Sequence, residues 1–214
     1  PQDGWLSEES PDDPARLTHA RVWIVDPIDG TKALVQRMPE FCISAALVER
    51  GVPVIAAILN PSTDELFTAV RGGGLFLNGA RVIRSPAHDF NPVIMVNAWE
   101  LRSDRWSTLA ETTRCRPMYS IANALALVAA GRIQAAFTIE PENEWDLAAG
   151  VLLIEESGGT ISDAAGKPFV FNQPIPRFRG VIAVATTADK ELRANLQTHA
   201  ERARSQPERK RAAP

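Results

Sequence analysis

Two aspartates lie three residues apart at the end of an apolar run, in the segment formed by residues 23–31 (WIVDPIDGT). The carbonyl of Ile28 lies between Asp26 and Asp29. A strand that ends in a tight turn holds both carboxylates on one side and so gathers hard oxygen ligands. Magnesium prefers ligands of this kind. The segment therefore predicts a metal site.

The pair Gly30-Thr31 follows directly and opens a short predicted helix. The first amides of a helix have no intrahelical partner and attract a phosphate. Metal ligands beside such amides indicate metal-assisted phosphoryl chemistry. The alternative is a plain turn, because Asp-Pro and Asp-Gly are frequent turn dipeptides without a catalytic role. Convergence of further carboxylates on this segment decides between the two interpretations.

Two other segments supply acidic residues, and each has a structural explanation of its own. Glu8 and Glu9 follow an apolar pair, and by themselves they form a solvated acidic turn. Asp146 opens an apolar helix, where a first-turn acid stabilises the N-terminus without a metal. The small residues 148–150 let that helix pack close to a sheet.

Length and composition are those of a globular protein. The chain has 214 residues, of which 45% are hydrophobic and 23% charged, and its formal charge is −3. This balance gives no reason to expect nucleic acid or a membrane surface as a partner. No apolar run is long enough to span a bilayer and no signal-peptide pattern is present, so we expect a cytoplasmic location. Cys42 and Cys115 are expected to be reduced thiols.

The first half of the chain predicts an antiparallel meander. Strands are expected over residues 22–25, 41–48, 54–59, 66–70 and 75–77. The triple glycine of residues 72–74 lacks the spacing of a phosphate loop and its Lys-Ser or Lys-Thr. A hairpin turn is predicted there instead.

The second half alternates strands with helices. Strands are expected over residues 93–96, 116–119, 134–139 and 181–185, and helices near residues 104–112, 121–130, 145–157 and 189–200. Such alternation predicts a layered α/β arrangement. We expect a metal- and phosphate-binding α+β lobe over residues 1–92, an α/β lobe over residues 93–200, and a disordered basic tail over residues 201–214.

Together, three segments resemble the inositol monophosphatase superfamily, which includes 3′(2′),5′-bisphosphate nucleotidases and, more distantly, fructose-1,6-bisphosphatases. The segments are residues 6–10 (LSEES), 23–31 (WIVDPIDGT) and 144–150 (EWDLAAG), and they occur in the family's order and approximate spacing. The resemblance covers residues 5–199. It implies an α+β fold, a layered sugar-phosphatase-like αβαβα sandwich whose first sheet is mixed and largely antiparallel. It also implies a Mg²⁺-dependent, lithium-sensitive phosphatase that forms a homodimer.

The resemblance implies a shared metal-ligand set. Glu8 is a ligand, Asp26 bridges two ions, Ile28 contributes its carbonyl, and Asp29 and Asp146 contribute one carboxylate each. These groups hold two or three Mg²⁺ ions. The ions activate a water for in-line attack on a phosphomonoester, so no protein nucleophile is needed.

The resemblance also implies the phosphate site and the catalytic residues. Gly30 and Thr31 hold the phosphate through their amides, and the Thr31 hydroxyl orients the attacking water. Glu8, Asp29 and Thr31 are the implied catalytic residues, whereas Glu9 is assigned no direct role. Family members carry a helical region, with a water-positioning acid, before the segment that matches Glu8. Only seven residues precede Glu8 here, so we expect an N-terminally truncated member with exposed apolar sheet surface.

Substrate contacts are implied by a few positions. Lys32, after Asp-Gly-Thr, resembles the bisphosphate-nucleotidase branch. Inositol monophosphatases place an acid several residues before their Trp-Asp pair, and Glu140 takes that role only with a shift. Ser120 either contacts the substrate or caps a helix. The expected substrate is a small phosphorylated metabolite, with a preference for adenosine 3′,5′-bisphosphate. The alternatives are inositol-1-phosphate and, in another class, a non-catalytic relative acting through protein or RNA contacts.

Overall fold

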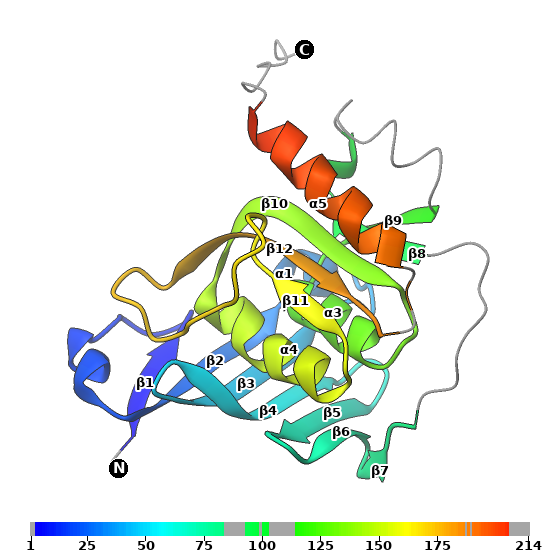
Figure 1. The fold of residues 1–214 in the computed structure, drawn as a ribbon. Helices are drawn as coiled ribbons and strands as arrows, with labels where there is room; N and C mark the ends of the chain where they lie inside the picture. The colour runs from blue at the N-terminus through cyan, green and yellow to red at the C-terminus, as the bar shows by residue number, and fades with distance from the viewer. Residues whose placement is uncertain are drawn as a thin grey trace.

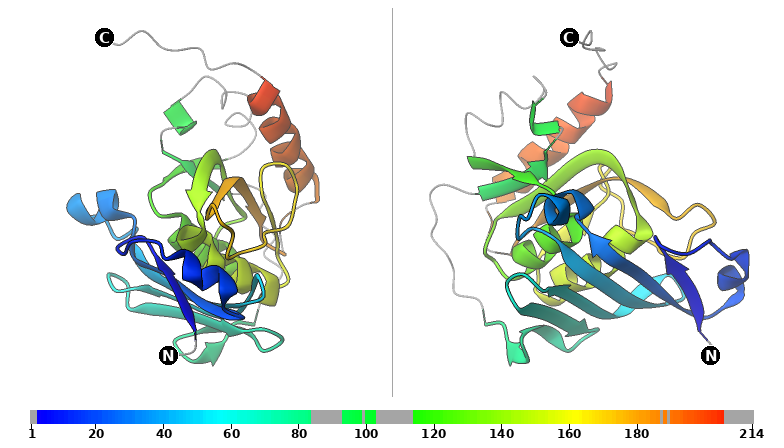
Figure 2. Two further views of the ribbon diagram at one scale, coloured as in Figure 1. Left: turned by 90° about the vertical axis from the view of Figure 1, so that its left-hand side faces the viewer. Right: turned by 180° about the vertical axis from the view of Figure 1, so that it is seen from behind.

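The computed structural model describes residues 3–83, 93–98, 100–102, 114–186, 188 and 190–205. These residues form four layers, in the order of a seven-stranded sheet, a helix pair, a five-stranded sheet and a single helix (Figures 1 and 2). The layered α+β fold predicted from the sequence is thereby confirmed. The helix expected near residues 104–112 and residues 206–214 of the expected tail lie outside the described residues.

The seven-stranded sheet is mixed and almost entirely antiparallel, as predicted. Only β1 pairs in parallel, with β2, and each later strand pairs antiparallel with the one before it. The strands are β1 (Gly4–Ser7), β2 (Arg21–Asp29), β3 (Cys42–Glu49), β4 (Val52–Asn60), β5 (Glu65–Val70), β6 (Gly74–Leu77) and β7 (Ala80–Arg81). The triple glycine forms the turn between β5 and β6, so the predicted hairpin is confirmed.

The two faces of this sheet differ because successive side chains of a strand point to opposite sides. One face is buried against the helix pair, with Ile24, Ala46, Ile58 and Phe67 each at most 1% exposed. The other face is also apolar but is only partly covered by the described residues. Its side chains include Trp5, Ile43, Ile55, Leu66 and Val70, which are 38–57% exposed.

The five-stranded sheet has the order β11-β12-β10-β8-β9. Its strands are β8 (Val93–Asn97), β9 (Arg114–Met118), β10 (Ala135–Asn143), β11 (Thr160–Ser162) and β12 (Arg177–Val184). β10 continues four residues beyond the Ile139 at which the sequence predicted its end. The pairing with β12 is irregular between Thr138 and Pro141. A bulge admits a proline because no ladder hydrogen bond is required of it there.

Two helices fill the space between the sheets. They are α3 (Ile121–Ala129) and α4 (Glu144–Glu156), which contact each other and strands of both sheets. The sequence predicted that the small residues of α4 allow close packing on a sheet. Gly150 instead faces the neighbouring helix, since a Cβ there would collide with Leu125 Cδ1 and lie 2.7 Å from Leu125 Cβ. The close approach at this position is therefore between α4 and α3.

The remaining helices lie at the outside of these layers. α5 (Lys190–Ser205) covers the far face of the five-stranded sheet (Figure 1). Leu192, Leu196 and Ala200 pack there with Phe137. It continues to Ser205, so the prediction that a disordered tail starts at residue 201 was wrong for its first five residues. The short helices are η1 (Pro14–Thr18), α1 (Thr31–Val35) and η2 (Glu100–Arg102).

No helix in the described parts of the chain is both long and apolar enough to cross a membrane. The division into two lobes at residue 92 stays a prediction.

The contact between Gly150 and Leu125 can be tested by overfilling it. We expect Gly150→Ala to destabilise the protein by about 1–3 kcal/mol, because an added methyl group forces the two helices apart. The higher helix propensity of alanine offsets at most about 1 kcal/mol. Urea unfolding measures the change. In the double variant Gly150→Ala/Leu125→Ala the cost should be smaller than the sum of the single costs; additive costs would contradict the contact.

Candidate metal centre

A bulge at the end of β2 turns Asp26 and Asp29 to the same side of the sheet. Residues three apart on a regular strand point to opposite faces. Here Asp26 pairs with Ser44 and Asp29 pairs with Cys42, so β2 has one more residue than β3 between these pairs. Ser44 and Cys42 are two apart and both face the buried side. The extra residue therefore places both aspartates on that side, and Pro27 lies where no ladder hydrogen bond is needed.

Local hydrogen bonds hold each aspartate in place. The amide of Ile28 donates to Asp26 Oδ1 over 2.8 Å. Asp29 Oδ2 accepts from the Ser120 hydroxyl over 2.6 Å and from the Ala122 amide over 2.7 Å. The carboxylate of Asp29 is thus enclosed at the N-terminus of α3, where helix amides favour a negative charge.

Ser120 is 1% exposed and caps α3, because its hydroxyl oxygen accepts from the amide of Asn123 over 3.0 Å. The helix-cap alternative for Ser120 is confirmed. A direct contact between Ser120 and substrate stays a prediction.

The third carboxylate comes from the N-terminus of α4. The amide of the N-cap residue Asn143 donates to Asp146 Oδ2 over 2.7 Å, so Asp146 is a first-turn acid that stabilises the helix start, as its structural explanation predicted. Its side chain nevertheless joins the other two aspartates: the oxygen ligand atoms of Asp26, Asp29 and Asp146 lie within 4.8 Å of one another. Asp146 therefore both stabilises the start of α4 and belongs to the carboxylate cluster.

Burial and mutual repulsion make this cluster poor at holding negative charge by itself. Burial, together with the charge of Asp29, raises the pKa of Asp26 to about 7 and that of Asp146 to about 8. Burial also raises the pKa of Asp29 to about 6, against the hydrogen bonds from Ser120 and Ala122. A divalent cation would remove this conflict, and buried carboxylate oxygens are suitable ligands for Mg²⁺. The donor set therefore fits the expected metal.

Glu8 lies beside the cluster but on its exposed side. It follows β1 in the predicted acidic turn and remains exposed, as does Glu9. A hydrogen bond with Glu8 and the charge of Glu8 both contribute to the raised pKa of Asp26. The sequence did not predict the four-residue strand β1, which pairs Ser7 with Val25 and so brings Glu8 to the end of β2.

The residues expected to bind phosphate form the turn after Asp29. Gly30 has φ +89°, and a Cβ there would lie 2.7 Å from the Glu40 carbonyl oxygen, so only glycine fits. Its amide hydrogen-bonds the Asp29 carboxylate. The Thr31 hydroxyl donates to the carbonyl oxygen of Ile28 over 3.2 Å. Lys32 is exposed on α1, and no described contact joins it to the carboxylates.

Further acids line the side of the cluster formed by β10. Glu140 is half-buried and lies in the irregular part of that strand. Burial, with the charges of Asp146, Asp29, Glu100 and Glu140, raises the pKa of Glu142 to about 9. The sequence analysis did not single out Glu142. The signal for it was the acid at every second position from residue 140 to 146, which places Glu140 and Glu142 on one face of an extended strand.

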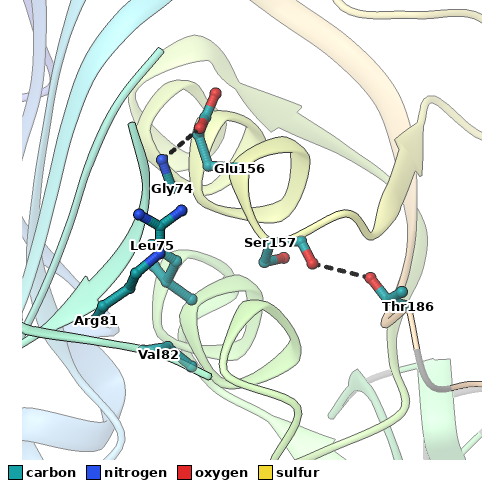
Figure 3. Close-up of a pocket in the computed structure, with 7 residues that line it drawn as sticks. All are labelled: Gly74, Leu75, Arg81, Val82, Glu156, Ser157 and Thr186. Atoms are coloured by element: carbon teal, nitrogen blue, oxygen red, sulfur yellow. Dashed lines mark hydrogen bonds between the residues drawn. The ribbon is translucent and has the colours of Figure 1, made fainter. Parts of the chain in front are cut away.

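A cavity of about 260 Å³ lies at the C-terminal end of α4 (Figure 3). The helix rise places this end about 15 Å from Asp146. Two of the polar side chains around it are already engaged in hydrogen bonds. Glu156 accepts from the amides of Gly72 and Gly74 over 2.7 Å each, and the Thr186 hydroxyl donates to the Ser157 carbonyl over 2.9 Å. The glycine turn therefore fastens the C-terminus of α4 and does not contribute to the carboxylate cluster.

Sequence comparisons give a consistent family match. The sequence profile described as the inositol monophosphatase family matches residues 1–205. Nus factor SuhB of Escherichia coli strain K12 is 37% identical over 153 residues, which are 67% of this chain and 57% of that protein. The inositol-1-monophosphatase of Rhizobium meliloti is 38% identical over 175 residues, which are 78% of this chain and 65% of that protein. The chain thus spans less than two thirds of the length of either relative.

Solved structures agree in fold. The crystal structure of the extragenic suppressor protein SuhB from Bartonella henselae matches with a TM-score of 0.76 at 30% identity, over 94% of this chain and 80% of that one. An IMPase from Thermotoga maritima matches with a TM-score of 0.78 at 28% identity, over 94% of this chain and 76% of that one.

The raised pKa values predict how metal-free protein responds to pH. The pKa values of Asp26, Asp29 and Asp146 lie above the unfolded value near 4, so the folded state binds more protons than the unfolded state between pH 5 and 8. Stability from this source is full below the unfolded pKa and is lost as the pH rises through the folded values. We expect the free energy of unfolding in chelator to fall by at least about 2 kcal/mol from pH 5 to pH 8.

Urea unfolding at several pH values measures this slope. Asp146→Asn should flatten it, because one of the titrating groups is removed, and added Mg²⁺ should restore stability at pH 8. Constant or rising stability toward pH 8 in chelator would show that the cluster is not under electrostatic conflict.

Proposed function

Because the chain belongs to the inositol monophosphatase family, we propose that it carries the metal centre of a Mg²⁺-dependent phosphatase acting on a small phosphorylated metabolite. The observation that carries the proposal is the convergence of Asp26, Asp29 and Asp146 within 4.8 Å, beside the turn at Gly30 and Thr31. Without a cation, such a grouping of buried acids destabilises the folded protein. With one, it supplies the oxygen ligands that a divalent cation prefers.

The proposed ligands are Asp26, Asp29 and Asp146, with Glu8 and the carbonyl of Ile28 completing the set for two or three ions. Bound Mg²⁺ supplies Lewis-acid stabilisation of the phosphoryl oxygens and lowers the pKa of water. The protein holds these ligands by the β2 bulge and by the N-termini of α3 and α4. Because these contacts hold the ligands before substrate binds, the carboxylates themselves need little reorganisation during the reaction.

Thr31 is proposed to orient the attacking water. Its hydroxyl donates its proton to the Ile28 carbonyl, which leaves the hydroxyl oxygen free to accept a proton of that water. A water held in this way directs a lone pair away from Thr31. The backbone amides of Gly30 and Thr31 are proposed to hold the phosphate. The Gly30 amide must then release its hydrogen bond to the Asp29 carboxylate and donate to the phosphate instead.

Two substrates are candidates within this reaction class. Adenosine 3′,5′-bisphosphate is favoured by Lys32, an exposed cation next to Thr31 that is available to a second phosphate. Inositol-1-phosphate is favoured by the relative named inositol-1-monophosphatase and by Glu140, a half-buried acid available to ring hydroxyls. We place the nucleotide first. Lithium sensitivity and a cytoplasmic homodimer are proposed with the same activity.

A non-catalytic role is the candidate from another class. It is favoured by the relatives named Nus factor SuhB. In that case the carboxylates serve structure alone, and partner contacts replace catalysis.

Phosphate release from the purified protein tests these proposals. We expect turnover that requires Mg²⁺, falls with Li⁺, and drops at least about 100-fold in Asp29→Asn, because the variant loses a charged ligand next to the reacting phosphate. The surface variant Arg71→Lys, at the far end of α4, should retain wild-type turnover.

Measurements with the two substrates separate the candidate functions. A kcat/KM for adenosine 3′,5′-bisphosphate no greater than that for inositol-1-phosphate would reject the nucleotide preference. Lys32→Ala should raise the KM for the bisphosphate and leave that for inositol-1-phosphate unchanged. Absence of Mg²⁺-dependent release from every phosphomonoester tried would favour the non-catalytic role.

A further inference from the structure

The proposed reaction makes no use of Arg16, whose buried guanidinium lies near the charge of Glu144 at the N-terminus of α4. Arg16 belongs to η1 and is 2% exposed. Its Nε and Nη2 donate to the two carboxylate oxygens of Asp12 over 2.6 and 2.9 Å. Its Nη1 donates to Asn172 Oδ1 over 2.7 Å, and Nη2 also donates to the Gln173 carbonyl over 2.9 Å. The planar fork of an arginine suits such a set of acceptors, and a lysine does not reproduce it.

A buried carboxylate reaches the same two residues from the other side. Glu144, the first residue of α4, is fully buried. Its Oε2 accepts from the amide of Asn172 over 2.7 Å and its Oε1 from the amide of Gln173 over 2.8 Å. Asn172 has φ +60°, so this short segment adopts a left-handed turn that few residue types favour. Arg16 and Glu144 therefore hold Asn172 and Gln173 between them.

Each end of this link leads to a carboxylate of the metal centre. On one side η1 packs against β1, since a Cβ at Gly4 would lie 3.2 Å from Arg16 Cα. Glu8 lies in the turn that joins β1 to η1, beyond the last residue of β1 that pairs with β2. On the other side Asp146 follows Glu144 by two residues on the same helix. The link therefore connects the segment of β1, the Glu8 turn and η1 to the N-terminus of α4, in addition to the pairing of β1 with β2.

We propose that Arg16 and Glu144 are positioning residues that hold Glu8 in place relative to Asp146, through Asn172 and Gln173, and so complete the divalent-cation site. The proposal rests on the metal centre of the proposed function. Neither residue contacts the cation; they act by fixing the turn that presents Glu8. Groups that hydrogen-bond a metal ligand typically change metal affinity by about 10- to 100-fold when removed, and we expect the less direct action of Arg16 and Glu144 to fall at the lower end of that range.

The test is the affinity of the folded, phosphate-free protein for Mn²⁺, measured by electron paramagnetic resonance. Arg16→Lys keeps the charge but loses the fork, and Glu144→Gln keeps the shape but replaces one acceptor with a donor. We expect each to weaken Mn²⁺ binding by about tenfold. Asn172→Gly accommodates the left-handed turn but lacks the side-chain amide whose oxygen accepts from Arg16. It should weaken Mn²⁺ binding less than the other two variants. This variant preserves the test if the others fail to fold.

Two further measurements separate positioning from general destabilisation. Leu196→Ala removes a buried side chain of α5 on the far face of the five-stranded sheet, so it should lower thermal stability and leave Mn²⁺ affinity unchanged. Hydrogen exchange in metal-free Arg16→Lys should become faster at residues 8–12 than in wild type, while exchange in α5 stays the same.

The outcomes are distinct. Equal Mn²⁺ affinity in wild type and in the Arg16 and Glu144 variants overturns the positioning role while leaving the metal centre intact. An equal loss of affinity in Leu196→Ala assigns the effect to general stability and also overturns it. If wild-type protein binds no Mn²⁺, the metal centre of the proposed function fails, and the positioning role fails with it. If the losses of Mn²⁺ affinity in Arg16→Lys and Glu144→Gln add up in the double variant, the two residues do not belong to a single link. A loss in the double variant close to that of either single variant supports the link.

Discussion

Carboxylates of like charge have to be held side by side, away from water, at the end of β2. The bulge at Pro27 meets the geometric part of this requirement, because one extra residue turns Asp26 and Asp29 to the same face. The N-terminus of α3 meets part of the electrostatic requirement by donating an amide to Asp29. The compensation is incomplete, since burial still raises the pKa of Asp29 to about 6. The layers of sheet and helix serve to maintain this one unfavourable grouping.

Much of the fold was predictable because its elements have strong local patterns. The strands from β2 to β6 alternate apolar and polar or small residues and are separated by glycine and asparagine turns, so their type and order followed from sequence. β1 escaped prediction because four residues carry too little pattern, and its pairing with β2 depends on tertiary context. Gly150 was assigned to a helix–sheet contact, since spacing along a helix does not identify the partner of a given face.

In the candidate site, too, some residues were predictable from sequence and others were not. The segment around Asp26 and Asp29 has residue types and spacing that indicate oxygen ligands locally, and Asp146 was found through resemblance to a family. Glu142 was missed because an acid on a strand resembles an exposed residue until its burial is known. The pairing of Arg16 with Glu144 was equally hidden, because it passes through the backbone of a distant turn and leaves no motif in either segment.

The separation of the ligands along the chain has a consequence for folding. β2 and α4 lie far apart in the chain, so no short piece of it contains the cluster of Asp26, Asp29 and Asp146. The docking of α4 against β2 brings negative charges together and is opposed by their repulsion. A cation that binds only the docked state opposes that repulsion and shifts the equilibrium toward it by mass action. If the proposed metal centre binds a divalent cation, the supply of that cation during refolding acts on the yield of native protein, independently of any substrate.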